Sequence, residues 1–162
     1  EYVYAVLASW GMHRMGSTGA KLLPFEELAR SIRSQRSSLE HMWAWPIHSV
    51  TEEQIDHLWS LIHSIHASAT RTILVANSKV LHHLLPRLVP PIDREYTLWF
   101  FNYWDIGGLD ESIFRNIYPK LQEIANRCRK VIAENIGTHP WHTSSTKVLD
   151  SALVGFVLKE LS

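Results

Sequence analysis

The residue types best suited to chemistry are gathered around Ser78, Lys79 and Asp93. The apolar spacing predicts a short helix from about Ser78 to Leu85, so Ser78 can cap its first turn and Lys79 adds a full positive charge there. Free N–H groups at a helix start favour a phosphate or a carboxylate as ligand. In the simpler interpretation, Ser78 is an ordinary cap and Lys79 is a solvated residue.

Asp93 follows two prolines that fix its approach, and we expect it to cap a helix that runs to about Trp104. The cap would use the backbone amides of Glu95 or Tyr96. In a functional interpretation, Asp93 is a positioned carboxylate that faces Lys79 across a helix–loop–helix unit. A capping carboxylate can serve both purposes.

The Ser-Lys pattern nearly recurs near the start of the last predicted helix, in the run Ser145-Thr146-Lys147-Val148-Leu149. Two helix starts that each carry a lysine, Lys79 and Lys147, can flank one anionic ligand, with Ser145 as a nearby hydroxyl. The alternative is that both helices simply solve the same capping problem. Arg94 adds a further positive charge beside the first motif.

Ten histidines suggest a metal site at first sight. His139 and His142 are three residues apart, but the chain has neither a His-Glu-x-x-His motif nor a cysteine pair, so we predict no metal site and no cofactor. His82 and His83 lie one turn after Lys79. They are the histidines best placed to contact a ligand or to transfer a proton.

Helices must position these groups, because a 3.6-residue apolar period dominates the chain. Thr51 and Gln54 match a capping box ahead of an apolar stripe that ends at about His66. Only residues 71–76 resemble a strand. We therefore predict an all-α fold: one compact domain over residues 1–162 with about seven to nine short helices. Because Glu1 already stands inside an apolar stretch, we expect the natural N-terminus to have been trimmed.

The same pattern predicts two further helices. A helix that starts at Pro24 is predicted to run towards Arg36 and on to Met42. Another starts at Asp110, and Pro119 is expected to divide or kink it.

The charge balance limits the classes of function. Lys and Arg number 16, and Asp and Glu number 16, so the net charge is zero. A neutral protein does not coat DNA or membranes by bulk electrostatics, although basic blocks such as residues 71–94 leave local positive faces. No apolar run reaches the 18–20 residues of a membrane span. The single cysteine, Cys128, indicates a reducing compartment, so we expect a cytoplasmic protein.

The order of Lys79, a short apolar helix, Pro-Ile-Asp93 and a further amphipathic helix resembles the core of the helix-hairpin-helix DNA glycosylase superfamily. By this match, Lys79 corresponds to the lysine of the bifunctional members and Asp93 to the family aspartate. The resemblance covers residues 70–104, and residues 72–78 lack the glycines of the family's hairpin. The pattern is also similar to uncharacterised bacterial and archaeal proteins with Ser-Lys-x-Leu-His followed by Pro-x-x-x-Pro-x-x-Asp.

The resemblance implies removal of a flipped base, with the aspartate stabilising positive charge at the sugar and the lysine attacking its anomeric carbon. We therefore expect a nucleic-acid-associated protein that binds DNA and performs base excision or lyase chemistry in DNA repair. Two alternatives remain open. One is a non-enzymatic helical interaction module, whose aromatic run at residues 99–104 contacts a partner. The other is a protein that binds a small anion.

Overall fold

The computed structural model describes residues 1–12, 22–70, 72–103 and 109–162, and within these ranges the chain is all-α. The helices in chain order are α1 (Tyr2–Ser9), α2 (Phe25–Ser34), α3 (Arg36–Met42), α4 (Glu52–Ser64), α5 (Leu74–Leu84), α6 (Asp110–Arg127), α7 (Arg129–Asn135) and α8 (Ser145–Glu160), with a 3₁₀ turn η1 (Ile47–Ser49) and a π-helical segment η2 (Arg94–Leu98). The described part contains one isolated bridge and no strand. The predicted all-α fold with seven to nine helices is confirmed.

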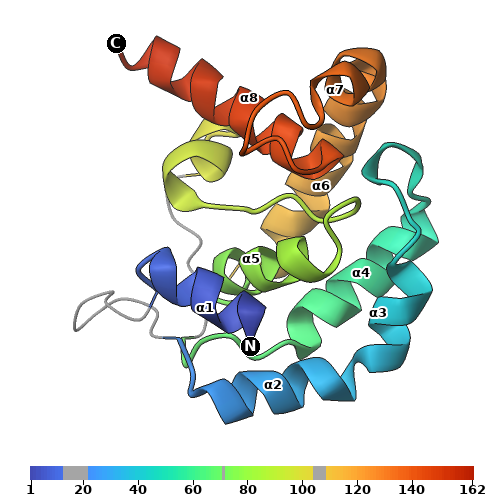
Figure 1. Cartoon of the computed structure of the whole chain (residues 1–162). Helices are drawn as coiled ribbons and strands as arrows, with labels where there is room; N and C mark the ends of the chain where they lie inside the picture. The colour runs from blue at the N-terminus through green and yellow to red at the C-terminus, as the bar shows by residue number, and fades with distance from the viewer. Residues whose placement is uncertain (13–21, 71, 104–108) are drawn as a thin grey trace.

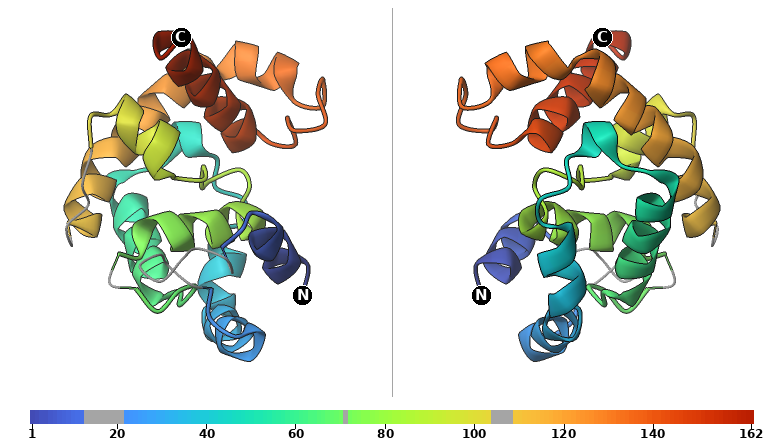
Figure 2. Two further views of the ribbon diagram at one scale, coloured as in Figure 1. Left: turned by 90° about the vertical axis from the view of Figure 1, so that its left-hand side faces the viewer. Right: turned by 90° about the vertical axis from the view of Figure 1, so that its right-hand side faces the viewer.

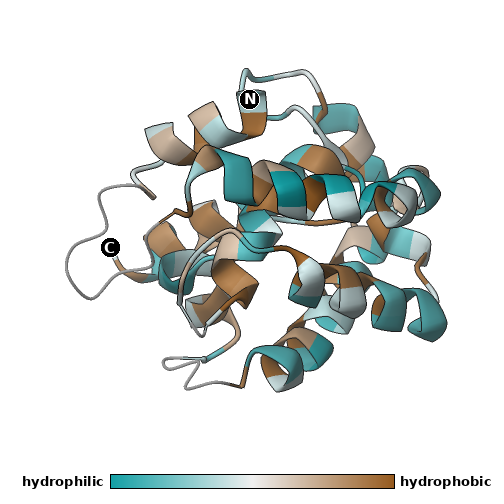
Figure 3. Ribbon diagram, turned by 90° about the horizontal axis from the view of Figure 1, so that it is seen from below, coloured by the Kyte–Doolittle hydropathy of each residue, from teal (hydrophilic) through white to brown (hydrophobic). Residues whose placement is uncertain are grey.

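Helix α5 is the centre of the arrangement (Figure 1). It packs against α1, α4 and α6, and α8 packs against α6, α7 and η2. The side views show α7 and α8 at one end of the molecule and α2 at the other (Figure 2). Apolar and polar residues occur together on the helices (Figure 3), as expected where a helix buries part of its surface.

Helix α4 forms as the sequence predicts. The Thr51 side chain accepts a hydrogen bond from the Gln54 amide at 3.3 Å, and the Gln54 side chain accepts one from the Thr51 amide at 2.9 Å. This capping box satisfies two free donors at the helix start. The apolar stripe is buried, with Leu58 and Ile62 fully enclosed. The helix ends at Ser64, two residues before the predicted limit.

Helix α5 begins at Leu74, four residues before the predicted start at Ser78. The Leu74 amide donates to the buried carboxylate of Asp110 at 2.8 Å, so a residue from α6 satisfies the first turn. Residues 74–76, which resembled a strand, belong to this helix, and residue 71 lies outside the described ranges. Ser78 therefore does not cap α5, and Lys79 lies in its second turn.

Other predicted boundaries differ for local reasons. The predicted helix from Pro24 to Met42 is broken at Gln35, whose ψ of 13° leaves the helical range. Pro119 does not divide α6, and the break falls at Cys128 instead, between α6 and α7. The helix expected to run from Asp93 to Trp104 is the shorter segment η2, and Trp104 lies outside the described residues.

Residues 86–92, between α5 and η2, have no helix of their own and are held by side chains from the surrounding elements. Thr146 donates to the Pro86 carbonyl at 2.7 Å, Tyr118 to the Leu88 carbonyl at 3.0 Å, and His82 contacts the Val89 carbonyl at 2.9 Å. The Tyr118 ring is fully buried, and burial raises the pKa of its hydroxyl. We call this stretch the tethered segment.

None of the helices in the described ranges is both long and apolar enough to cross a membrane.

Candidate functional site

Lys79 lies half-buried on α5, under an aromatic ring from the N-terminal helix region. Its ammonium nitrogen is 5.9 Å from the ring centroid of Trp10, which directly follows α1. A cation over an indole face is attracted by the ring quadrupole. The Trp10 side chain is still 41% exposed, so the pair is open to solvent on one side.

Asp93 caps η2 and is partly buried. One of its carboxylate oxygens, Oδ1, accepts hydrogen bonds from the amides of Tyr96 at 2.6 Å and Thr97 at 3.4 Å. The expected cap is therefore confirmed, with Tyr96 as one of the two donors. Both of these hydrogen bonds end on Oδ1, which leaves Oδ2 for another contact.

Ser78 joins the helix that carries Lys79 to the backbone just before Asp93. Its hydroxyl is fully buried, donates to the Val75 carbonyl at 3.1 Å, and accepts from the Ile92 amide at 3.1 Å. Ile92 directly precedes Asp93, and Ser78 directly precedes Lys79. The predicted ligand role of Ser78 is not supported, because its hydroxyl is enclosed and in use. It acts as a clamp between α5 and the end of the tethered segment.

A largely buried ion pair lies on α8. Lys147 donates to Oδ2 of Asp150 at 2.5 Å, and the Asp150 side chain is only 5% exposed. Burial raises the pKa of Asp150, and the charge of Lys147 opposes that shift. The charge of Asp93 also raises this pKa and that of Lys79 lowers it, so both residues lie within electrostatic reach of one buried carboxylate.

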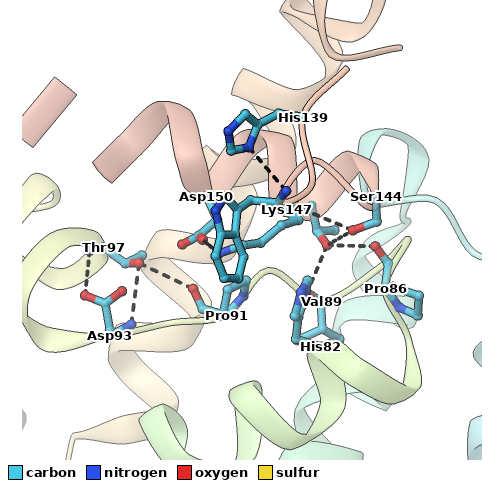
Figure 4. Close-up of polar contacts among 12 residues, drawn as sticks. His82, Pro86, Val89, Pro91, Asp93, Thr97, His139, Ser144, Lys147 and Asp150 are labelled. Atoms are coloured by element: carbon cyan, nitrogen blue, oxygen red, sulfur yellow. Dashed lines mark hydrogen bonds and ion pairs between the residues drawn. The ribbon is translucent and has the colours of Figure 1, made fainter. Parts of the chain in front are cut away.

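The view of the polar contacts shows Lys147 and Asp150 on the side of α8 that faces the segment from Pro91 to Thr97 (Figure 4). Beside them is a cavity of about 370 Å³, which is lined in part by Trp141, His139 and His142. Asp150 is a candidate that the sequence reasoning missed. The signal was its position three residues after Lys147 on an apolar helix face, where a carboxylate needs a partner.

His82 is part of the interior. It is 4% exposed, and its Nδ1 contacts the Val89 carbonyl at 2.9 Å and the Thr146 hydroxyl at 3.3 Å. Because a carbonyl only accepts, Nδ1 carries the proton. Burial lowers the pKa of His82 to about 4. The ring is thus neutral near pH 7 and ties α5 to the tethered segment and to α8, which leaves it little room for the predicted ligand contact.

His83 has the more open imidazole. Its ring centroid lies 5.0 Å from that of Trp10 and 6.4 Å from that of Tyr2. Its Nε2 is buried and has no hydrogen-bond partner in the described part of the chain. Burial lowers the pKa of His83, and the positive charge of Lys147 lowers it further. A neutral imidazole with a free nitrogen can accept a proton or a hydrogen bond.

The structure therefore separates the predicted site residues into two groups. One group comprises Lys79, His83, Asp93 and Lys147, and it is linked by electrostatic interactions to Asp150, which was not predicted. We call these five residues the Lys79 cluster. The others do not join it. Ser78 and His82 are enclosed, Arg94 is exposed at the start of η2, and Ser145 lines a different cavity.

Residues 99–103 are the described part of the aromatic run at residues 99–104, and they include two phenylalanines that pack on the core. Phe100 meets Phe156 of α8 edge-to-face with ring centroids 5.2 Å apart, and Phe101 lies 5.8 Å from the Lys120 ammonium. Both phenylalanines are partly buried against the core cluster.

The Lys79 cluster combines two ammonium groups, two carboxylates and a neutral imidazole. Such a set can hold an anionic group, form an imine with a carbonyl carbon or move a proton. In the described ranges, no three His, Cys, Asp or Glu side chains converge as metal ligands. No protein family model matches the sequence, and neither a curated protein nor a solved structure matches it.

Proposed function

We propose that this protein associates with nucleic acid and carries a DNA-glycosylase-like site, in which Lys79 acts as nucleophile and Asp93 stabilises positive charge at the sugar. The observation that supports this best is the clamp made by Ser78. It joins the residue before Lys79 to the residue before Asp93 through a hydrogen bond of 3.1 Å, so the backbone that carries the lysine is fixed to the backbone that carries the carboxylate. The charges of both residues also act on the pKa of one buried carboxylate, that of Asp150.

The chemistry requires Lys79 to give up a proton before it attacks. His83 follows Lys79 by one helical turn on α5, and its Nε2 has no partner, so it is suited to accept that proton. The freed lone pair forms a C–N bond to the aldehyde carbon C1′ of an abasic sugar. The carbonyl oxygen takes up protons and leaves as water, and a protonated imine results. Asp93 supplies negative charge beside this cation through the oxygen that is free of cap bonds.

Borohydride trapping on DNA that contains an abasic site tests this proposal. Hydride addition to the imine carbon gives a permanent amine, so wild-type protein is expected to form a covalent adduct with the DNA. Lys79→Ala is expected to lose the adduct. Lys159→Ala provides the matched control, because Lys159 is an exposed lysine near the other end of α8.

A variant of Lys147, the other lysine of the Lys79 cluster, distinguishes between the two candidate nucleophiles. Lys147→Ala is expected to retain part of the adduct if Lys79 attacks. If wild-type protein forms no adduct, or if Lys79→Ala forms as much as Lys159→Ala, Lys79 is not the nucleophile and the proposal fails. A mass spectrum of the trapped peptide identifies the modified residue directly.

A further inference from the structure

A second cavity, separate from the Lys79 cluster, lies where η1, α7 and the start of α8 meet. Its volume is about 360 Å³. Apolar side chains form much of its wall. Ile47 and Ala125 are almost fully buried, Ile132 is 7% exposed, and Ile136 is 45% exposed. A mostly apolar concavity of this size is typical of small-molecule sites.

Two arginines stand at the edge of this cavity. Arg87 comes from the tethered segment and Arg129 is the first residue of α7. Both guanidinium groups act on His48, which lines the same cavity. Burial lowers the pKa of His48, and the charges of Arg129 and Arg87 lower it further. The two arginines therefore direct positive potential at one place.

Neither arginine is neutralised by a carboxylate within the described ranges. The arginines that do pair there, Arg36, Arg115 and Arg127, each meet an acidic side chain. Arg87 and Arg129 instead flank an apolar wall together with hydroxyl groups, among them that of Ser145. Guanidinium groups suit carboxylate or phosphate oxygens, because their fork of donors matches the geometry of these anions.

We propose that this cavity binds a small amphiphilic anion, a medium-chain carboxylate whose head group lies between Arg87 and Arg129 and whose chain covers Ala125 and Ile132. The two arginines favour an anionic group and the apolar wall favours a hydrocarbon chain, so the ligand must carry both. At roughly 30 Å³ for each water-sized group, the cavity accommodates about twelve non-hydrogen atoms, and an eight-carbon carboxylate has about ten. The proposal does not depend on the Lys79 cluster.

Calorimetric titration of the full chain with octanoate tests the proposal, with 1-octanol and octylammonium as neutral and cationic probes of the same length. We expect saturable binding of octanoate with a Kd below about 1 mM, and at least tenfold weaker binding of the other two probes. Octyl phosphate, with the same chain and a different anionic head, shows whether the site selects carboxylate over phosphate.

Variants locate the binding. Arg87→Gln and Arg129→Gln are each expected to weaken octanoate binding about tenfold, since each removes a charged hydrogen-bond donor. Arg127→Gln is the matched control, because it lies near Arg129 but pairs with Glu123. Ala133→Phe, which places a large ring at the cavity wall, is expected to abolish binding, and circular dichroism verifies that each variant folds.

The proposal is overturned if octanoate shows no saturation, if 1-octanol binds as well, or if the two arginine variants bind like Arg127→Gln.

Discussion

The buried imidazole of His82 makes the stability of this protein depend on pH in a defined window. In the folded protein, burial lowers the pKa of His82 from its ordinary value of 6.5 to about 4. In the unfolded chain, the ring is solvated and its pKa returns to about 6.5. Between these two values the unfolded state binds a proton that the folded state does not bind.

This difference in bound protons sets the direction in which the free energy of unfolding changes with pH. Where the unfolded state binds more protons, the free energy of unfolding rises with pH. The contribution of His82 to the free energy of unfolding is therefore complete above about pH 6.5, and it is lost as the pH falls towards 4. Each tenfold change in proton affinity is worth about 1.4 kcal/mol, so the total contribution is about 3 kcal/mol. That is a large part of the 5–15 kcal/mol typical of a folded domain.

His82→Gln isolates this contribution, because an amide can still donate to the Val89 carbonyl but does not titrate. Urea denaturation of wild type and variant at pH 7 and at pH 4 gives the free energy of unfolding of each. We expect the wild-type protein to be the more stable at pH 7. Its advantage should shrink by about 3 kcal/mol at pH 4. Other histidines, such as His48 and His83, titrate in both proteins and cancel in the comparison.

A difference between wild type and variant that stays the same at both pH values would refute this reasoning. It would mean that the His82 ring is solvated in the folded state, or that it is charged there and paired with an acidic group.

Three further predictions concern buried polar contacts. Asn77→Ala removes an amide side chain that bonds three buried backbone groups, so it should lower the free energy of unfolding by about 3 kcal/mol in urea denaturation. A loss no larger than that of the exposed Asn116→Ala would contradict these contacts. Ser144→Ala should cost about 1 kcal/mol through loss of the α8 cap, whereas Ser144→Asp should cost little in the same assay. Lys147→Met should lower the melting temperature, because it leaves the Asp150 carboxylate buried without its partner. Adding Asp150→Asn should restore much of the loss. A double variant that is as unstable as Lys147→Met would argue against the ion pair.

The elements that the sequence predicted well carry their start signals within a few residues. Helix α4 has its capping box at Thr51 and Gln54, and α8 begins after the cap residue Ser144, at the predicted place. Helix α5 lacks such a local signal. Its first turn is completed by Asp110, which is 36 residues away in the chain, so its start could not be located from the sequence around Ser78.

Part of the candidate functional site could also be predicted from the sequence. Lys79 and Asp93 could be singled out because they flank one short helix and a proline turn. The spacing from Lys147 could have marked Asp150 as a paired carboxylate, but its relation to Lys79 and Asp93 could not be predicted, because that relation depends on how α8 packs against η2. A buried serine within a helix and a capping serine have the same sequence signature, so the sequence around Ser78 does not distinguish the two. Burial likewise separates His82 from His83, although the two are adjacent.

The tethered segment has a consequence for how a ligand would meet this protein. Each of its bonds to Tyr118, His82 and Thr146 reaches a side chain anchored in a different part of the helical core, and Ser78 closes its far end. A loop fixed in this way has already lost its conformational entropy when the protein folds. A ligand that contacts its edge therefore binds to a prepared surface and spends little of its affinity on ordering the chain.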